Sequence, residues 1–378
     1  MLIVGAGILN RSEPGTPRAT LTFPTVVPLS NGTLLATCRS GSTKDCDDET
    51  IEFCRSTDLG ASWSAPCRPF QAPAVRGVRG TLKVCYVTEW APGRLIAAFL
   101  WVDRETYPGQ RLFHSETEGC LPMTVLLADS DDLGETWTQL REVPMPDELG
   151  PPSLTNPILV LDDGTLVMSI ESNKTYHDVS KWKQKVVLRH STDAGRTWGP
   201  PRVAGFDPSG RIFNWDQRAG VAPDGRLVAF LWTYDSQTRS YRNIHRRISA
   251  DGGHNWSGAE DLGFTDQPAH PAIMTDGRVV LAWVDRFQRQ AIFARLTAAI
   301  DTSFDPDSEV VLYRHVDATH GDTDQGGALG LSVWSFGLPY ADVLPDGDVL
   351  VVYYAGIETE MDIHWARIRV DPDGRAVV

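Results

Sequence analysis

Aromatic, basic and acidic residues gather just before and just after six short apolar stretches of this chain. Indole rings can stack on a sugar ring, guanidinium groups can form paired hydrogen bonds with a carboxylate, and acidic side chains can transfer protons. Such a mixture, converging on one site, is suited to an acidic sugar. The candidate substrate-binding residues are Arg39, Arg218, Arg286, Trp215, Asp285, Gln267, Glu171, Tyr234 and Trp101.

Five other side chains are candidates for catalysis, namely Asp47, Asp48, Asp216, Tyr340 and His270. Asp47 and Asp48 belong to an acidic run that is either a solvated loop or the source of a proton donor. Asp216 and Arg218 form a charged pair next to Trp215, and such a pair is costly to bury without a role. The imidazole of His270 either takes part in chemistry or hydrogen-bonds to the backbone.

Some of these candidates have an equally good structural explanation. Trp101 follows an apolar stretch at a point where packing between sheets is as plausible as stacking on a ligand. Asp285 and Arg286 repeat the sequence Val-Asp-Arg that also occurs at positions 102–104, and this recurrence favours a shared structural role as much as a shared site.

Six turn sequences set the spacing of the apolar stretches. Each turn contains a glycine and is followed by an apolar segment of the kind that forms one strand of a β-hairpin. The turns are Asn31-Gly32, Pro92-Gly93, Asp163-Gly164, Asp224-Gly225, Asp276-Gly277 and Asp346-Gly347. Because no segment shows a sustained helical period, we expect little helix.

A second repeat ends in tryptophan and has the form S-x-D-x-G-x-[ST/N]-W. Its four copies cover residues 56–63, 130–137, 191–198 and 249–256. The aspartate can accept hydrogen bonds from backbone N–H groups two residues on, the glycine supplies a positive φ, and the tryptophan is a large packing anchor. Each copy therefore predicts a hairpin turn, and the recurrence predicts a repeat architecture. We name these segments the Trp-ended turns.

These four copies resemble Asp-boxes, and the whole chain resembles the sialidase-type (BNR-repeat) β-propeller superfamily. The resemblance implies one all-β domain over residues 1–378, a six-bladed β-propeller of four-stranded antiparallel blades. The apolar segment 2–9 is placed to add a strand to the last blade. In a blade the glycine turns and the Trp-ended turns share one face, so we expect the site at the opposite face.

The resemblance also implies roles for single residues. Sialidases carry a carboxylate-binding arginine in the phrase F/Y-R-I-P, and this chain has Leu-Thr-Phe-Pro at 21–24, with Thr22 in place of the arginine. Asp47 or Asp48 matches the acid/base position. Tyr340 lies about two positions out of register with the tyrosine nucleophile. Arg218 and Arg286 would be the other carboxylate ligands, with Arg39 substituting for the first.

Three functions are compatible with this sequence. The first is a sialidase-like exo-glycosidase that hydrolyses a terminal acidic sugar, such as a sialic-acid-like or uronic-acid-containing glycan. The second is a polysaccharide lyase or rhamnosidase-like enzyme, in which His270 with Tyr340 or Tyr234 transfers protons. The third is a carbohydrate-binding propeller without catalysis, because one scaffold hosts many functions.

Charge argues against nucleic acid as a partner. The formal net charge is −14, the pI is near 5.1 and the 35 basic residues are scattered. A nucleic-acid-binding protein is expected to carry a basic patch. The partner that we expect is a carbohydrate.

The remaining composition points to a protein without cofactor or membrane segment. The six cysteines match no metal-binding spacing, and no His/Cys/Asp cluster is typical of zinc or calcium, so we expect no metal, no cofactor and buried free thiols. The start of the chain has no leader pattern, and no apolar run is long enough to span a membrane. The sequence as written predicts a cytoplasmic protein, and a trimmed secreted protein would look the same.

Overall fold

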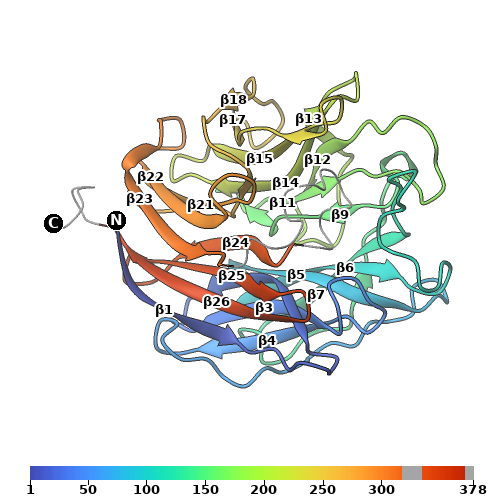
Figure 1. Ribbon diagram of the computed structural model, residues 1–378, viewed down its shortest axis with the longest axis horizontal. Helices are drawn as coiled ribbons and strands as arrows, with labels where there is room; N and C mark the ends of the chain where they lie inside the picture. Colours follow the sequence, from blue (N-terminus) through green and yellow to red (C-terminus); the bar gives the residue numbers. More distant parts are fainter. Residues whose placement is uncertain (317–333, 371–378) are drawn as a thin grey trace.

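The computed structural model describes residues 1–316 and 334–370, and in these ranges the chain is built from β-strands. One 3-10 turn, Asp147–Leu149, is present, and the described residues contain no α-helix, as the sequence predicts. Figure 1 shows that the chain passes through successive sheets and returns, so that its first and last strands lie side by side.

The first and last parts of the chain share a seven-stranded sheet. Its order is β24-β25-β26-β2-β3-β4, and β1 pairs with β26. The strands are β1 (Leu2–Asn10), β2 (Thr20–Pro28), β3 (Leu34–Gly41), β4 (Thr50–Ser56), β24 (Phe336–Val343), β25 (Val349–Ile357) and β26 (Glu360–Arg369). All pairs are antiparallel except one contact between Thr20 of β2 and Met361 of β26. The predicted N-terminal strand therefore forms, and it pairs antiparallel with the last strand of the chain.

Four further sheets follow one another along the chain. One contains β5 (Gly80–Ala91), β6 (Arg94–Asp103), β7 (Met123–Ser130) and β8 (Arg141–Glu142), and the next β9 (Ser153–Leu154), β10 (Leu159–Val160), β11 (Leu166–Glu171), β12 (Lys185–Ser191) and β13 (Arg202–Phe206). The third contains β14 (Ile212–Val221), β15 (Leu227–Asp235), β16 (Ser240–Tyr241), β17 (His245–Ser249) and β18 (Glu260–Asp261). The fourth contains β19 (Gln267–Pro268), β20 (Ala272–Ile273), β21 (Val279–Asp285), β22 (Ala291–Thr297) and β23 (Asp305–Arg314).

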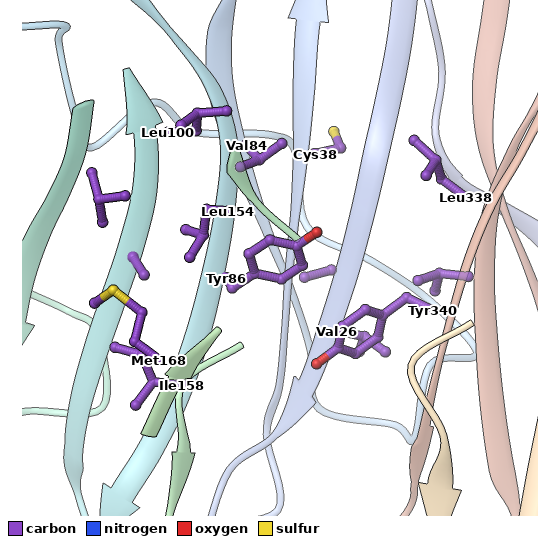
Figure 2. Packing of buried hydrophobic residues seen from close by; sticks show 14 of the residues in the cluster. Val26, Cys38, Val84, Tyr86, Leu100, Leu154, Ile158, Met168, Leu338 and Tyr340 are labelled. Carbon is purple, nitrogen blue, oxygen red and sulfur yellow. The ribbon is translucent and has the colours of Figure 1, made fainter. Parts of the chain in front are cut away.

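The strand that stands second in the pairing order of each sheet is the most deeply buried. Every residue of β11, β15 and β21 is buried, and these strands read as nearly continuous apolar runs. Such runs form strands that are covered on both faces. Residues of β2, β5 and β24 meet residues of other sheets in the interior, as Figure 2 shows.

In all four Trp-ended turns the aspartate accepts the same backbone hydrogen bond, whereas the indole N–H of Trp198 in the third copy has no partner in the described ranges. In the first, Asp58 accepts hydrogen bonds from the N–H of Ser62 (2.9 Å) and from the hydroxyls of Ser62 (2.6 Å) and Ser56 (2.8 Å). The aspartate thus caps a backbone N–H four residues on, rather than two as the sequence suggested. Gly60 has φ 86°, as predicted, and the residue before it, Leu59, also has a positive φ of 59°. The indole of Trp63 donates to the carbonyl of Gly60 (3.0 Å).

The glycine turns and the Trp-ended turns lie at the same end of the strands. The N–H of Leu133, in the second Trp-ended turn, donates to the carbonyl of Gly93 in a glycine turn (3.2 Å). Inner strands such as β14 therefore begin at the opposite end, where β11 and β15 finish. The loops that carry most of the site candidates therefore lie at the end of the strands opposite the glycine turns.

All six cysteines, which lie within the described residues, are free, and Cys38, Cys54, Cys85 and Cys120 are buried. Burial raises the pKa of the Cys85 and Cys120 thiols well above the usual value, so these groups act as small apolar core residues.

Across the described ranges, no helix is long and apolar enough to cross a membrane.

Candidate active site

Three inner strands carry the same irregularity. The pairing register shifts between Thr22 and Thr25 in β2, between Trp215 and Arg218 in β14 and between Gly337 and Tyr340 in β24. One residue in each interval has a positive φ: Phe23 (52°), Asp216 (47°) and Leu338 (46°). A β-bulge redirects a side chain that regular pleating would place elsewhere. These three redirected side chains line one cavity.

This cavity has a volume of about 110 Å³ and lies at the end of the inner strands away from the glycine turns. Its wall is mostly apolar and aromatic, and a few polar groups point into it, which is the usual composition of a small-molecule pocket. The lining includes Phe23, Lys83, Val84, Phe113, Ser153, Leu154, Thr155, Glu171, Asn173, Trp182, Trp215, Asp216, Trp232, Gln267 and Leu338. We call it the bulge pocket.

Asp216 is held in the bulge pocket by two side-chain partners. Its Oδ1 atom pairs with the guanidinium of Arg218 at 2.7 Å, and its Oδ2 atom accepts a hydrogen bond from the amide of Gln267 at 2.7 Å. Arg218 is itself fixed by a hydrogen bond to the hydroxyl of Tyr86 at 2.9 Å and another to the carbonyl of Thr155. Charge-assisted bonds of this kind fix the orientation of the Asp216 side chain.

Glu171, the last residue of β11, is the second carboxyl group of the pocket. It accepts hydrogen bonds from the N–H of Gln217 (3.1 Å) and the hydroxyl of Thr155 (3.0 Å), and it forms no ion pair with the described residues. Burial, together with the negative charge of Asp216, raises the pKa of Glu171 to about 8. Glu171 therefore keeps its proton near neutral pH.

The two carboxyl groups thus have unlike surroundings, because Asp216 has an arginine partner and Glu171 has none among the described residues. A protonated carboxylic acid can donate to a leaving oxygen, and a neighbouring carboxylate can attack or activate water. The indole rings of Trp215, Trp182 and Trp232 supply flat apolar surface for a sugar ring. The pocket has the groups that acid–base cleavage of a glycosidic bond requires.

Lys83 brings a positive charge to the pocket wall, and it is tied to a buried ion network. Its ammonium lies 2.7 Å from Glu49, whose carboxylate also pairs with Arg39 and, at 3.0 Å, with Arg104. Burial opposes ionisation of Glu49, but Lys83, Arg39 and Arg104 outweigh it and lower its pKa to about 2. Asp45 joins the network through Arg104 (2.7 Å). The loop between β3 and β4 is therefore anchored by its acidic residues.

The three predicted arginines are each neutralised by a carboxylate of the protein. Arg39 pairs with Glu49, Arg218 with Asp216 and Arg286 with Asp266 at 3.0 Å. Arg286 also donates to Gln267 and lies over the rings of Trp334 and Trp232. The described lining of the bulge pocket contains none of the three. From behind the pocket, Arg218 holds Asp216 and Arg286 holds Gln267, both of which line it.

Asp47 and Asp48 do not reach the bulge pocket. Asp48 is exposed and accepts hydrogen bonds from the N–H (3.0 Å) and hydroxyl (3.1 Å) of Ser42 in its own loop. Asp47 is exposed, with 58% of its side-chain surface accessible. The solvated-loop interpretation describes these two residues, and the buried members of the run, Asp45 and Glu49, serve the ion network.

Tyr340 and His270 lie on a second cavity, at the end of the inner strands that carries the glycine turns. Regular strand spacing separates residues two apart by about 7 Å. Leu338 is therefore the residue of β24 that reaches the bulge pocket, and Figure 2 shows Leu338 and Tyr340 at different levels of the interior. The two rings of Tyr340 and His270 do stack, with centroids 4.7 Å apart.

The other candidates divide between the pocket and the core. Trp215 and Gln267 line the bulge pocket, and Tyr234 supports it by stacking on Trp215 with centroids 4.9 Å apart. Trp101 packs in a separate core cluster and donates to the carbonyl of Pro73 (3.0 Å). Asp285 accepts the N–H groups of residues 288 (3.0 Å) and 289 (3.2 Å), so it shapes a turn.

Several lining residues were not among the sequence candidates, namely Phe23, Lys83, Phe113, Ser153, Thr155, Asn173, Trp182 and Leu338. Lys83 carried a usable signal, because a lone lysine interrupts an apolar inner strand at Leu-Lys-Val. Trp182 stands alone among lysines in the same way. For the bulged residues Phe23 and Leu338, the only sequence signal was the proline that follows each of them.

The fold of this chain is similar to that of solved sialidase-like β-propellers. No protein-family model matches the sequence, and no curated protein matches it by sequence. The likeness therefore comes from solved structures.

Three of these structures cover nearly the whole chain. A protein of unknown function from Dyadobacter fermentans superimposes with a TM-score of 0.76 at 20% identity, over 97% of this chain and 99% of that one. The intramolecular trans-sialidase of Ruminococcus gnavus gives 0.64 at 14% identity, over 100% and 99%. The α-L-arabinanase of Penicillium chrysogenum, complexed with arabinobiose, gives 0.64 at 15% identity, over 97% and 98%. Neighbours with known activity thus include propeller glycoside hydrolases.

Proposed function

We propose that this protein is a propeller glycoside hydrolase in which Glu171 is the general acid and Asp216 is the nucleophile or general base. The observation that carries the proposal is the pair of unlike carboxyl groups in one aromatic-walled pocket. Glu171 would protonate the leaving glycosidic oxygen. Asp216, held by Arg218 and Gln267, would attack the anomeric carbon or activate a water.

The proposal includes an architecture of six blades in a single domain. The four sheets of residues 80–314 would each be one blade, and the seven-stranded sheet would divide at the parallel contact between β2 and β26 into two more. The bulge pocket would then lie at the axis, with each inner strand contributing to it.

A neutral terminal sugar is the substrate that fits the pocket best. The negative charge of Asp216 would repel a sugar carboxylate, and Arg39, Arg218 and Arg286 are already paired. Likeness to an arabinanase supports a small neutral sugar such as a pentose.

An acidic glycan is the second candidate substrate, and one observation favours it. A cavity that shares Asn173 and Trp182 with the bulge pocket is lined by four lysines, Lys174, Lys181, Lys183 and Lys185, and by three acidic residues, Asp147, Glu148 and Asp178. These ammonium groups would suit an acidic sugar next to the cleaved bond. The lyase mechanism through His270 and Tyr340 has less support, because those rings line the other cavity.

The test is hydrolysis of a panel of chromogenic glycosides by the purified protein. The panel includes 4-nitrophenyl α-L-arabinofuranoside, neutral hexosides, a glucuronide and the 4-methylumbelliferyl glycoside of N-acetylneuraminic acid. We expect Glu171→Gln and Asp216→Asn each to lower kcat/KM by roughly 10²–10⁴-fold, the usual range for loss of acid–base catalysis. Asp48→Asn and Tyr340→Phe are the controls and should retain activity.

The panel also distinguishes the alternatives. Loss of activity in Asp48→Asn with an unaffected Glu171→Gln would contradict the assignment and restore the acidic loop as the proton donor. An unsaturated product would indicate a lyase. Binding of glycans without turnover of any substrate would leave a carbohydrate-binding propeller.

A further inference from the structure

The second cavity lies at the end of the inner strands that carries the glycine turns. It has a volume of about 480 Å³, and residues of the turns, Ser30 and Pro92, form part of its rim. His270, Tyr340 and Asp342 line it together with the apolar surfaces of Trp90 and Ile158. The lining residues of this cavity and of the bulge pocket do not overlap, so the two are separate sites.

Two polar side chains in this cavity lack partners. Tyr340 is only 4% exposed, yet its hydroxyl makes no hydrogen bond with any described residue. The Nδ1 atom of His270 is buried and also without a partner among them. Burial, with a smaller effect from Arg218, lowers the pKa of His270 to about 3, so the imidazole is neutral. Unsatisfied buried groups are costly, and a ligand that bonds to them would recover that cost.

The charge of the cavity is negative. Asp342 accepts the N–H of Val343 (2.7 Å) and pairs with no basic side chain in the described ranges, and burial raises its pKa to about 7. Glu89 accepts only neutral donors there, from Ser30 (2.7 Å) and Gly93 (2.7 Å). The lining contains no lysine or arginine.

The basic groups nearby are already paired. The charge of Arg218 is balanced by Asp216 at 2.7 Å. Arg94 stacks on the ring of Trp90, with 4.4 Å between the guanidinium carbon and the ring centroid, and pairs with Asp131 at 2.8 Å. Within the described ranges, these two basic groups therefore leave the Asp342 carboxyl without a cationic partner.

We propose that the second cavity binds a small primary organic ammonium, paired with Asp342. An ammonium donates up to three hydrogen bonds, and the carboxyl group of Asp342 and the hydroxyl of Tyr340 are acceptors on residues that line the cavity. The carbon skeleton of the ligand lies against Ile158 and Trp90. A metal ion fits less well, because no group of three or more His, Cys, Asp or Glu side chains in the described residues could hold one.

Calorimetric titration with n-butylammonium chloride tests this site. The wild-type protein should bind n-butylammonium, and Asp342→Asn and Tyr340→Phe should each bind it at least about 10-fold more weakly, which corresponds to about 1.4 kcal/mol. Tetramethylammonium, which has no N–H donor, and n-butanol, which has no charge, should bind at least as weakly as n-butylammonium binds to Asp342→Asn.

The matched control variant is Glu171→Gln, which should bind n-butylammonium as the wild type does. Absence of binding to the wild type, equal binding of n-butanol, or loss of binding in Glu171→Gln would each overturn the proposal. Thermal unfolding of every variant accompanies the titrations. Tyr340→Phe removes one hydroxyl and keeps the ring, so it tests the site even where Asp342→Asn unfolds.

Discussion

Glu171 and Asp216 differ in what surrounds them rather than in their chemistry. Asp216 has a guanidinium partner at 2.7 Å, whereas Glu171 has only neutral donors and a negative neighbour. Desolvation and like charge both favour the neutral form of Glu171. Arg218 therefore makes the surroundings of the two groups unlike, although it lies behind the pocket.

The proton on Glu171 predicts how stability changes with pH. The ordinary pKa of a glutamate is 4.5, and that of folded Glu171 is raised to about 8. Between these values the folded state binds more protons than the unfolded state, so the free energy of unfolding falls as pH rises. In Glu171→Gln this fall should be smaller, as urea unfolding at pH 5, 7 and 9 would measure.

Other buried carboxyl groups limit the size of this effect. Burial also raises the pKa of Asp342 to about 7 and that of Asp266 to about 6, so the pH dependence should shrink in Glu171→Gln without vanishing. Asp48→Asn is the control, because its exposed carboxylate lies in a loop. Identical slopes for the wild type and Glu171→Gln would show that Glu171 is ionised in the folded protein at neutral pH.

The Trp-ended turns show how one local element is stabilised. In the second copy the hydroxyl of Ser130 accepts the N–H of Gly134 (2.8 Å) and donates to Asp132 (2.7 Å). Ser130→Ala removes both bonds from a buried position, so we expect a loss of about 1–2 kcal/mol in the free energy of unfolding. Activity should be unchanged, because the turn lies at the end of the strands away from the bulge pocket.

Urea unfolding and a glycoside assay check this prediction together. Ser115→Ala is a suitable control, because Ser115 is exposed and its hydroxyl makes no hydrogen bond in the described ranges. Its effect should stay within about 0.5 kcal/mol, as for most surface substitutions. A large loss of activity in Ser130→Ala would mean that this end of the strands influences the site.

Gly337 illustrates a close approach that no side chain permits. It has φ 149°, and a Cβ atom there would overlap the Nη2 atom of Arg286, which donates to Gln267. Gln267 in turn holds Asp216 at 2.7 Å. Gly337→Ala should therefore displace this chain of contacts and lower kcat more than it changes KM.

The control for Gly337→Ala is Gly258→Ala, because a Cβ atom at Gly258 would meet nothing within 4 Å. Steady-state kinetics on the best glycoside of the panel measure both variants. Unchanged kcat in a folded Gly337→Ala protein would contradict a positioning role for Arg286.

At the scale of the whole molecule, the sequence predicted the features that are local. The Trp-ended turns, the glycine turns and the pairing of the N-terminal strand depend on short segments with strong turn and strand preferences. The sequence did not predict which residue of an inner strand lies at the level of the pocket. Three bulges, at Phe23, Asp216 and Leu338, decide which residues enter the pocket, and nothing in alternating hydrophobicity marks them.

The predicted carboxylate ligands illustrate a second property that the sequence did not predict, namely which charges are paired within the protein. Arg39, Arg218 and Arg286 have the chemistry to bind a sugar acid, but each meets a carboxylate of the protein first. Two of those partners are distant in sequence, because Glu49 lies 10 residues from Arg39 and Asp266 lies 20 residues from Arg286. Only the folded chain shows that these charges are satisfied internally.

The pairing of the two chain ends leads to the last prediction. β1 runs antiparallel to β26 from Leu2 to Asn10, and the side-chain amide of Asn10 donates to Glu52 of β4 at 2.9 Å. Deleting residues 2–10 would expose the edge of β26, and unpaired edges promote association between chains. We expect a lower urea midpoint and higher oligomers in size-exclusion chromatography. Val4→Thr keeps the backbone pairing at an exposed position and should change neither, whereas a monomeric deletion variant of wild-type stability would show that β1 is dispensable.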